Sequence, residues 1–177
     1  SAYKYTKLNL TISDFKKISP FGTIYYNLYA GKVFGTVPYM LLNIAPGNEI
    51  YYYNKYAFNL MNRYEYIMDR YAGMQIEHNI GNGIFRLIPF NRFLKFRQFW
   101  NMKMIWGDMT EANRALNIRS DFPFVDLRGR TYMEMGTGVD NILRFFRLDL
   151  VWRLLPTPKP VERYRNFGVF GSFRLSF

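Results

Sequence analysis

The feature that most constrains this chain is a strict alternation of apolar and polar residues, which recurs in several separate segments. The stretch FRLDLVWR, residues 146–153, places Phe146, Leu148, Leu150 and Trp152 on one parity and mainly charged residues on the other. A period of two is the signature of a β-strand with one apolar face. The chain is therefore expected to be all-β.

The same alternation predicts seven strands. They cover about residues 3–16, 22–36, 72–85, 98–106, 133–139, 146–153 and 167–177. Short connections at 18–21, 86–96 and 140–144 alternate with longer ones at 37–71, 108–130 and 156–163. We expect a short helix in the second half of 37–71 and a polar loop at 108–130. In the hairpin 133–153, pairing Met135 with Leu150 brings both apolar sets to one face.

Composition narrows the partners. One fifth of the 177 residues are aromatic, which favours strands and surfaces that are apolar on one side and wet on the other. The net charge of +11 indicates an anionic partner, either nucleic acid or a phosphate-rich membrane surface. The absence of cysteine excludes disulfides and thiolate metal sites. The first residues, SAYKYTKLNL, resemble a strand and not a signal peptide, so an export signal would lie outside this sequence.

Two architectures fit this pattern. Alternating short and long connections are typical of a transmembrane antiparallel β-barrel in a Gram-negative outer membrane, with long outside loops at about 37–71 and 108–130 and a periplasmic carboxyl terminus. A soluble basic β protein that binds nucleic acid or glycan would alternate equally well. Aromatic residues at the ends of the apolar stripes, opposite a face of Arg, Asp, Glu and Gly, favour the barrel. Because single-chain barrels normally have an even number of strands, we expect residues 1–177 to be the carboxyl-terminal part of one larger barrel domain.

Specific stretches carry a resemblance. TYMEMGTGVDNILRFFRLDLVWRLL and NFGVFGSFRLSF resemble the last three strands of the BamA-type superfamily of outer-membrane assembly and two-partner secretion barrels. The stretches from Gly31 to Tyr71 and RLIPFNRFLKF resemble a Bacteroidota outer-membrane family with an amino-terminal carboxypeptidase-regulatory-like domain and no assigned function. The resemblance implies a barrel of about sixteen strands, of which this chain supplies the last seven.

The resemblance also implies a loop that folds back into the barrel. In the superfamily this loop carries an Arg-Gly-aromatic tip that meets an acidic residue. Here the matching region is PGNEIYYYN, which has no arginine. It keeps Gly47, taken as turn-forming, and aromatic residues, so we expect an inward-folded loop without the charged lock. The residues expected to form it are Gly47, Asn48, Tyr51, Tyr52 and Tyr53.

No catalytic residue, metal site or cofactor is expected. The single histidine, His78, shares the parity of Met74 and Ile76 and is expected to point away from the lumen. Polar residues that share the inward parity of the last three strands are expected to face the lumen: Glu134, Arg147, Asp149, Arg153 and Arg174. They could form a solute track or a docking surface for the loop, or a solvated ladder of weak ion pairs, which we favour. On that interpretation Arg153→Gln is nearly silent, whereas Leu150→Arg costs about 2–4 kcal/mol near the midplane.

Three functions remain open. The first is a barrel that helps to assemble or translocate outer-membrane or surface proteins; the second is a structural or accessory barrel that docks partners without transport; the third is the soluble binding protein described above. For the barrels, the resemblance implies several partners: outer-membrane lipid and lipopolysaccharide, the assembly machinery, other outer-membrane or periplasmic proteins, and the amino-terminal half of the same barrel. Nucleic acid is not expected. Phe173, Leu175 and Phe177 would form a terminal signal for that machinery.

Overall fold

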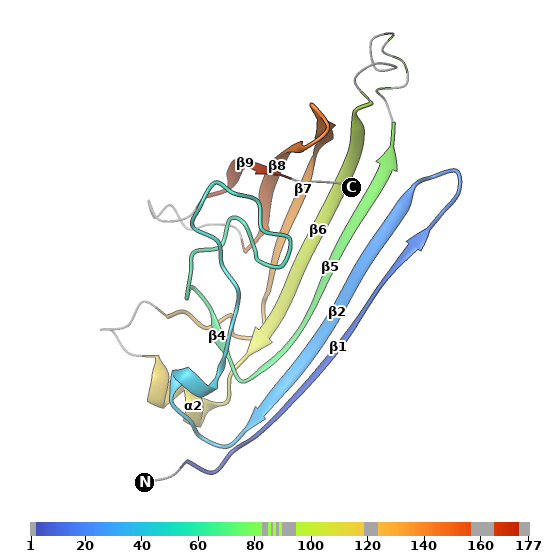
Figure 1. Ribbon diagram of the computed structural model, residues 1–177. Coiled ribbons are helices and arrows are strands. Elements are labelled where there is room, and N and C mark those ends of the chain that lie inside the picture. Colours follow the sequence, from blue (N-terminus) through green and yellow to red (C-terminus); the bar gives the residue numbers. More distant parts are fainter. Residues whose placement is uncertain are drawn as a thin grey trace.

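The computed structural model describes residues 3–82, 85, 87, 89, 95–118, 124–156 and 165–173. Strands make up 58% of the structure, and seven of them form one antiparallel sheet in the order β1-β2-β5-β6-β7-β8-β9. The strands of this sheet are β1 (Thr6–Lys17), β2 (Thr23–Phe34), β5 (Arg70–Gly81), β6 (Arg97–Asp108), β7 (Thr131–Ile142), β8 (Phe146–Leu155) and β9 (Phe167–Phe173). The prediction of an all-β chain with seven main strands is confirmed (Figure 1).

The long connections differ from the prediction. Residues 37–71 contain a 3₁₀ turn, η1 (Tyr39–Leu41), in their first half, and a two-stranded ladder of β3 (Asn43–Ile44) and β4 (Ile67–Met68). The short helix expected in the second half of this connection is therefore wrong for its described residues. The connection 108–130, expected to be a polar loop, contains α2 (Glu111–Asn117). The third strand was also placed too late, because β5 ends at Gly81, which has a φ of 73°.

The register of the β7–β8 hairpin is shifted by two residues from the predicted one. Leu150 lies opposite Thr137, and Met135 lies opposite Trp152. The cause lies at the turn end, where Asn141, Leu143 and Arg144 have positive φ and the register slips between Val139 and Ile142. Since the shift is even, each side chain stays on the face that the alternation predicted.

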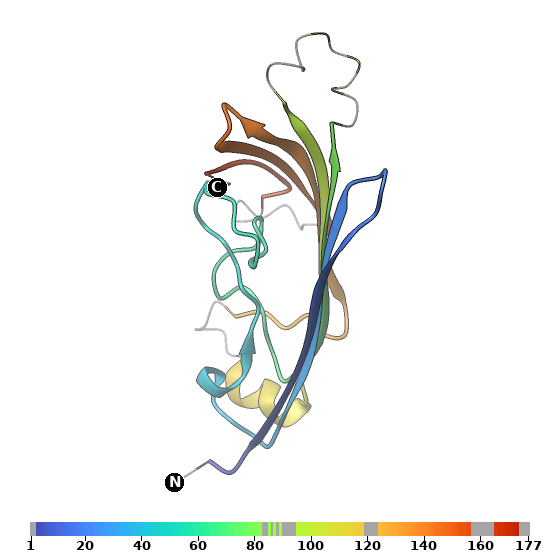
Figure 2. The same ribbon diagram turned by 45° about the vertical axis from the view of Figure 1, so that its right-hand side comes forward.

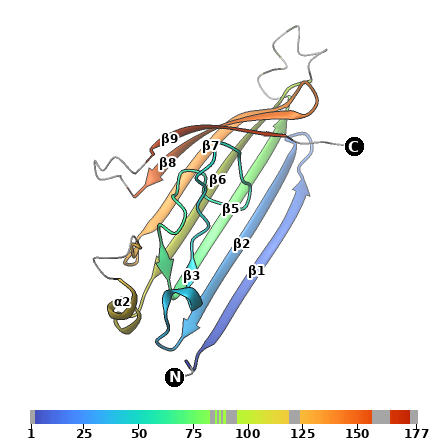
Figure 3. The same cartoon turned by 60° about the vertical axis from the view of Figure 1, so that its left-hand side comes forward.

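The sheet is long, twisted and open. It is not closed into a barrel, and β1 and β9 are its two edges. Figure 2 shows the sheet curving around the segment that joins β2 to β5, and Figure 3 shows that segment lying over the middle strands. We call the covered side of the sheet the concave face and the other side the convex face.

A compact layer holds the connections together at the end of the sheet near α2. The buried carboxylate of Asp69 accepts hydrogen bonds from the backbone and hydroxyl of Thr110 and from Asn113 of α2. Buried apolar residues of the same layer form a core of Val33, Val37, Leu42, Ile67, Met109 and Phe124. No helix among the described residues is long and apolar enough to cross a membrane.

Candidate functional site

The convex face carries apolar side chains that run across the sheet in register. One row passes from strand to strand through Ile12, Leu28, Met74, Met104, Met133 and Leu155. The next row consists of Tyr26, Ile76, Met102, Met135, Trp152 and Phe167. Several of these side chains are exposed, including Ile12 at 53%, Met135 at 42% and Trp152 at 40%. A surface of this extent is a candidate for contact with lipid or protein.

The concave face carries a row of polar side chains at the register positions between these two apolar rows. Asn27, Gln75, Lys103, Glu134 and Arg153 are successive cross-strand neighbours on β2, β5, β6, β7 and β8. The charges alternate in sign along the last three positions, which favours each neighbouring pair. The side chains of Lys103, Glu134 and Arg153 are nevertheless buried, with 2%, 1% and 6% of their surface exposed.

What buries them is the part of the β2–β5 connection between β3 and β4, residues 45–66, which we call the inner loop. The Glu134 carboxylate accepts hydrogen bonds from the backbone N–H groups of Asn59 (2.8 Å) and Leu60 (3.1 Å). The Lys103 ammonium donates to the carbonyl oxygens of Asn54 (2.8 Å) and Ala57 (2.6 Å). Glu134 thus accepts hydrogen bonds from loop N–H groups, and the neighbouring Lys103 donates to loop carbonyl oxygens. Both buried charges are therefore hydrogen-bonded to protein groups.

A second cluster of charged side chains is centred on Arg147 of β8, close to the turn between β7 and β8. Arg147 donates to both oxygens of Asp149 (2.9 and 2.8 Å) and to Glu77 of β5 (2.9 Å). Its guanidinium also lies over the rings of Phe99 (3.6 Å) and Tyr53 (4.7 Å). Because Tyr53 belongs to the inner loop, this ion pair also contacts the loop through an aromatic ring.

Arg153 makes the third attachment. It donates to Glu65 (2.9 Å) and to the hydroxyl of Tyr66 (3.0 Å), both on the inner loop. The interpretation of these charges as a solvated ladder is therefore wrong, because Glu134, Arg147, Asp149 and Arg153 are all buried and the loop docks on three of them directly. Arg174 lies outside the described residues.

The inner loop is also held by its own side chains. The amide of Asn59 accepts from Asn54 N–H (2.9 Å) and Asn48 Nδ2 (2.8 Å) and donates to the Asn54 carbonyl (3.0 Å). Gly47 does not have the positive φ expected of a turn glycine. A Cβ there would lie 2.2 Å from the Asn62 carbonyl oxygen, so glycine is required by the close approach of two loop strands.

The predicted tyrosines separate into two groups. Tyr53 is buried in a cluster with Leu60, Val151 and Phe170, whereas Tyr51 and Tyr52 are exposed. Burial holds the pKa of the Tyr53 hydroxyl well above its usual value, although the charge of Arg147 acts the other way. The loop lies on the concave face of the open sheet, where Glu134, Lys103 and Arg153 hold it through its backbone N–H groups, its carbonyl oxygens, and the side chains of Glu65 and Tyr66.

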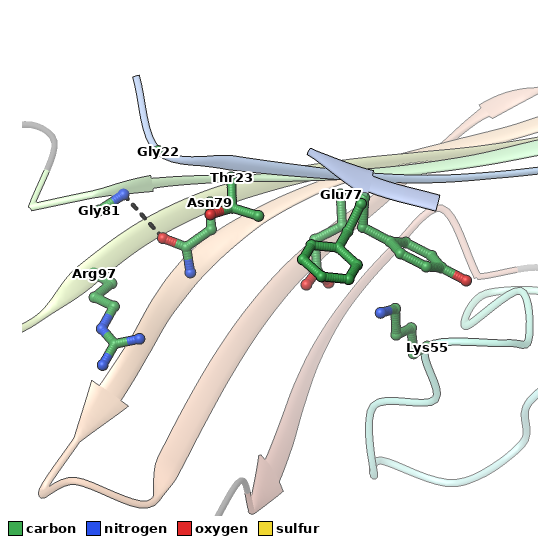
Figure 4. Close-up of a pocket in the computed structure, with 9 residues that line it drawn as sticks. Gly22, Thr23, Lys55, Glu77, Asn79, Gly81 and Arg97 are labelled. Atoms are coloured by element: carbon green, nitrogen blue, oxygen red, sulfur yellow. Dashed lines mark hydrogen bonds between the residues drawn. The ribbon is translucent and has the colours of Figure 1, made fainter. Parts of the chain in front are cut away.

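The remaining concave surface is open. A cavity of about 570 Å³ lies beside the inner loop near the β1–β2 turn, lined by Tyr25, Lys55, Glu77, Asn79, Arg97 and neighbouring residues. Figure 4 shows Lys55 and Arg97 reaching toward it from separate elements. The Lys55 ammonium lies 3.5 Å from the centre of the Tyr25 ring. The loop thus covers the β5–β9 side of the concave face, whereas β1 is exposed along its whole length.

Residues considered for chemistry are placed as follows. His78 lies on the convex face beside Trp100, whose indole N–H donates to His78 Nδ1 (3.0 Å). In the part of the chain that the structure describes, no group of three or more His, Asp or Glu residues could hold a metal ion. Lys103, Glu65 and Asn59 are functional residues that were not predicted from the sequence, although the polar parity of Lys103 within strand 98–106 was an available signal.

The site therefore defines a class by geometry: an open, seven-stranded antiparallel sheet with buried charges under an inner loop and an exposed apolar convex face. No protein-family model, curated protein or solved structure matches the chain.

Proposed function

We propose that this chain forms adjoining strands in the wall of an outer-membrane β-barrel, with its convex face toward lipid and lipopolysaccharide. The observation that carries the proposal is the polarity of the sheet: exposed apolar rows on the convex face lie opposite buried charges on the concave face. This is the distribution expected of a barrel wall and the reverse of that in a soluble sandwich.

Further strands of the same barrel would pair with the edges β1 and β9. An open edge in hydrocarbon leaves backbone groups unpaired at a cost of several kcal/mol each, so a wall with two such edges requires partners. The resemblance to BamA-type barrels supplies a size of about sixteen strands, with the amino-terminal half completing the wall.

Within this barrel the inner loop acts as a plug, which favours a structural or accessory role over solute transport. The loop is attached at Lys103, Glu134 and Arg153, and all three side chains are buried beneath it. The contacts at these three side chains leave no room for a solute between them and the loop. The open cavity beside it is the place where a periplasmic or outer-membrane partner could enter from the turn side.

A role in assembly of other outer-membrane proteins is the second candidate. The observation that favours it is the free edge of β9, where the inner loop forms a short parallel bridge with Gly171. An edge that a peptide segment can join is the element that strand addition requires.

The test of the proposal is the behaviour of the purified protein. We expect it to need detergent and to migrate differently in heated and unheated denaturing gels, because a closed barrel satisfies its own backbone hydrogen bonds and resists unfolding. A monodisperse monomer without detergent would overturn the proposal.

The carboxyl-terminal signal is tested separately in cells. Phe173 is exposed on the convex face and lies against Phe145 and Phe146, while Leu175 and Phe177 lie outside the described residues. If the assembly machinery recognises the terminal stripe, deleting Leu175 through Phe177 lowers the amount of protein in the outer membrane far more than it lowers the stability of folded protein. If the truncated protein is inserted into the outer membrane as efficiently as the intact protein, the terminal stripe serves only to pack the folded sheet and is not a signal.

A further inference from the structure

The free edge of β9 is occupied at one residue by the inner loop. The backbone N–H of Gly171 donates to the carbonyl oxygen of Tyr51 (3.1 Å), and the N–H of Tyr53 donates to the carbonyl oxygen of Gly171 (3.0 Å). These two bonds form a parallel bridge between Tyr52 and Gly171. The segment Tyr51–Tyr53, which we call the edge cap, therefore uses both backbone groups of Gly171.

The pairing of β9 with β8 explains why Gly171 is available. Gly171 lies opposite Leu148, and in an antiparallel pair alternate residues direct their backbone groups away from the partner strand. Gly171 directs its groups to the free edge, and so do Val169 and Phe173 by the same alternation. Among the described residues, the edge cap forms backbone hydrogen bonds to β9 only at Gly171, so most of this edge is left open.

The edge cap is attached by few side chains. Tyr51 and Tyr52 are 73% and 47% exposed, so neither ring anchors it by burial. Arg165, just before β9, donates to the Asn48 carbonyl (3.0 Å), and its guanidinium lies 5.9 Å from the centre of the Tyr51 ring. Only Tyr53 enters the core, against Phe170. The buried Tyr53 ring thus anchors one end of the cap, whereas the contact with the β9 edge itself consists of two backbone hydrogen bonds, each worth little net free energy where water can replace it.

We propose that the edge cap is a removable guard of the β9 edge, displaced when a barrel strand pairs there. The proposal rests on the proposed barrel, because the occupant that displaces the cap is an antiparallel strand with alternate apolar residues. Its apolar residues would continue the convex rows that end at Phe167 and Val169, and its backbone would take the Gly171 groups that the cap now holds. The inner loop and the incoming strand thus compete for one residue.

The first test uses the absence of native cysteine. Because residues joined in a parallel bridge are close enough for a disulfide, Tyr52→Cys/Gly171→Cys is expected to cross-link under mild oxidation in detergent. Tyr52→Cys/Val169→Cys is the matched control. Val169 lies two residues before Gly171 on the same edge of β9, so this pair is expected to cross-link far less. Equal cross-linking of the two pairs would overturn the placement of the cap.

The second test measures competition. The probe is a fluorescent synthetic peptide of residues 6–17, TKLNLTISDFKK, which has the required alternation. We expect the reduced Tyr52→Cys/Gly171→Cys protein to bind the peptide about tenfold more tightly than the oxidised protein, since locking the cap withholds two backbone hydrogen bonds. The control pair is expected to bind equally in both states. Equal affinity of the reduced and oxidised cap variants would overturn the proposal.

These results are independent of the barrel test. A protein that needs no detergent but shows the redox-dependent affinity would refute the barrel and retain the cap. A detergent-requiring protein whose Tyr52→Cys/Gly171→Cys variant cross-links, and whose β9 edge is therefore held by the cap, but which lacks that dependence would retain the barrel and refute the cap.

Discussion

The two faces of the sheet use the same backbone and opposite chemistry. On β6, Met102 and Met104 point to the convex face, while Lys103 between them is buried on the concave face. In a water-soluble sheet the buried side would carry the methionines and the exposed side the lysine. Burial of charge here therefore depends on a specific cover, the inner loop, whereas the exposed apolar rows of the convex face are the feature from which we propose contact with lipid.

The cover makes the concave face sensitive to loss of a single charge. Glu134 is the centre of this arrangement, because it compensates Lys103 and accepts two loop amides. We expect Glu134→Ala to lower the free energy of unfolding by about 3–5 kcal/mol, since it removes the negative charge beside the buried Lys103 ammonium and leaves the N–H groups of Asn59 and Leu60 without their acceptor. Denaturant unfolding in micelles measures this.

Glu111→Ala is the matched control. Glu111 pairs with Arg114 on α2, but its side chain is 88% exposed, so its removal is expected to leave stability nearly unchanged. If the two variants were equally stable, the concave charges would not be buried in solution.

A charge on the convex face tests the other side of the comparison. Leu150 lies between Thr137 and Val169 in a row across β7, β8 and β9. We expect Leu150→Arg to cost about 2–4 kcal/mol if this row lies near the membrane midplane. Folding yield into vesicles against urea measures the cost; an unchanged or improved stability would place the face in water.

Arg153→Gln was expected from the sequence to have almost no effect on stability, and the structure changes that expectation. A solvated Arg153 would tolerate glutamine, but the observed side chain pairs with the buried Glu65. We now expect a loss of about 2 kcal/mol, less than for Glu134→Ala because a glutamine amide can still donate a hydrogen bond. A stability equal to that of the wild type would restore the solvated interpretation.

The smallest effect concerns Tyr53. Its buried hydroxyl has no hydrogen-bond partner among the described residues, so Tyr53→Phe is expected to be neutral or to stabilise by up to about 1 kcal/mol near pH 7. The pKa of Tyr53 is raised in the folded state, so folding favours the neutral hydroxyl. Above the unfolded pKa of about 10 the unfolded chain loses this proton and the folded protein keeps it, so the wild type loses stability as the pH rises. The variant should therefore lose less stability than the wild type above that pH. Parallel pH profiles would contradict the burial of this hydroxyl.

The strands could be predicted from the sequence because a period of two is a local signal. The same pattern placed Glu134, Arg147, Asp149 and Arg153 on the correct face even though the β7–β8 register was off by two residues. It could not find that these charges are buried, because burial depends on the contact between residues 45–66 and strands distant in sequence. The roles of Asn59 and Lys103 are of the same kind, since both hold a loop conformation that no local pattern specifies.

The central claim is that the convex face contacts lipid, and the three native tryptophans test it most directly. Trp100, Trp106 and Trp152 all lie on that face, at register positions opposite His78, Ala72 and Met135. With the chain folded in brominated detergent or vesicles of brominated lipid, we predict strong quenching of tryptophan fluorescence by bromine and weak quenching by aqueous acrylamide. Strong acrylamide quenching with no effect of bromine would contradict the account.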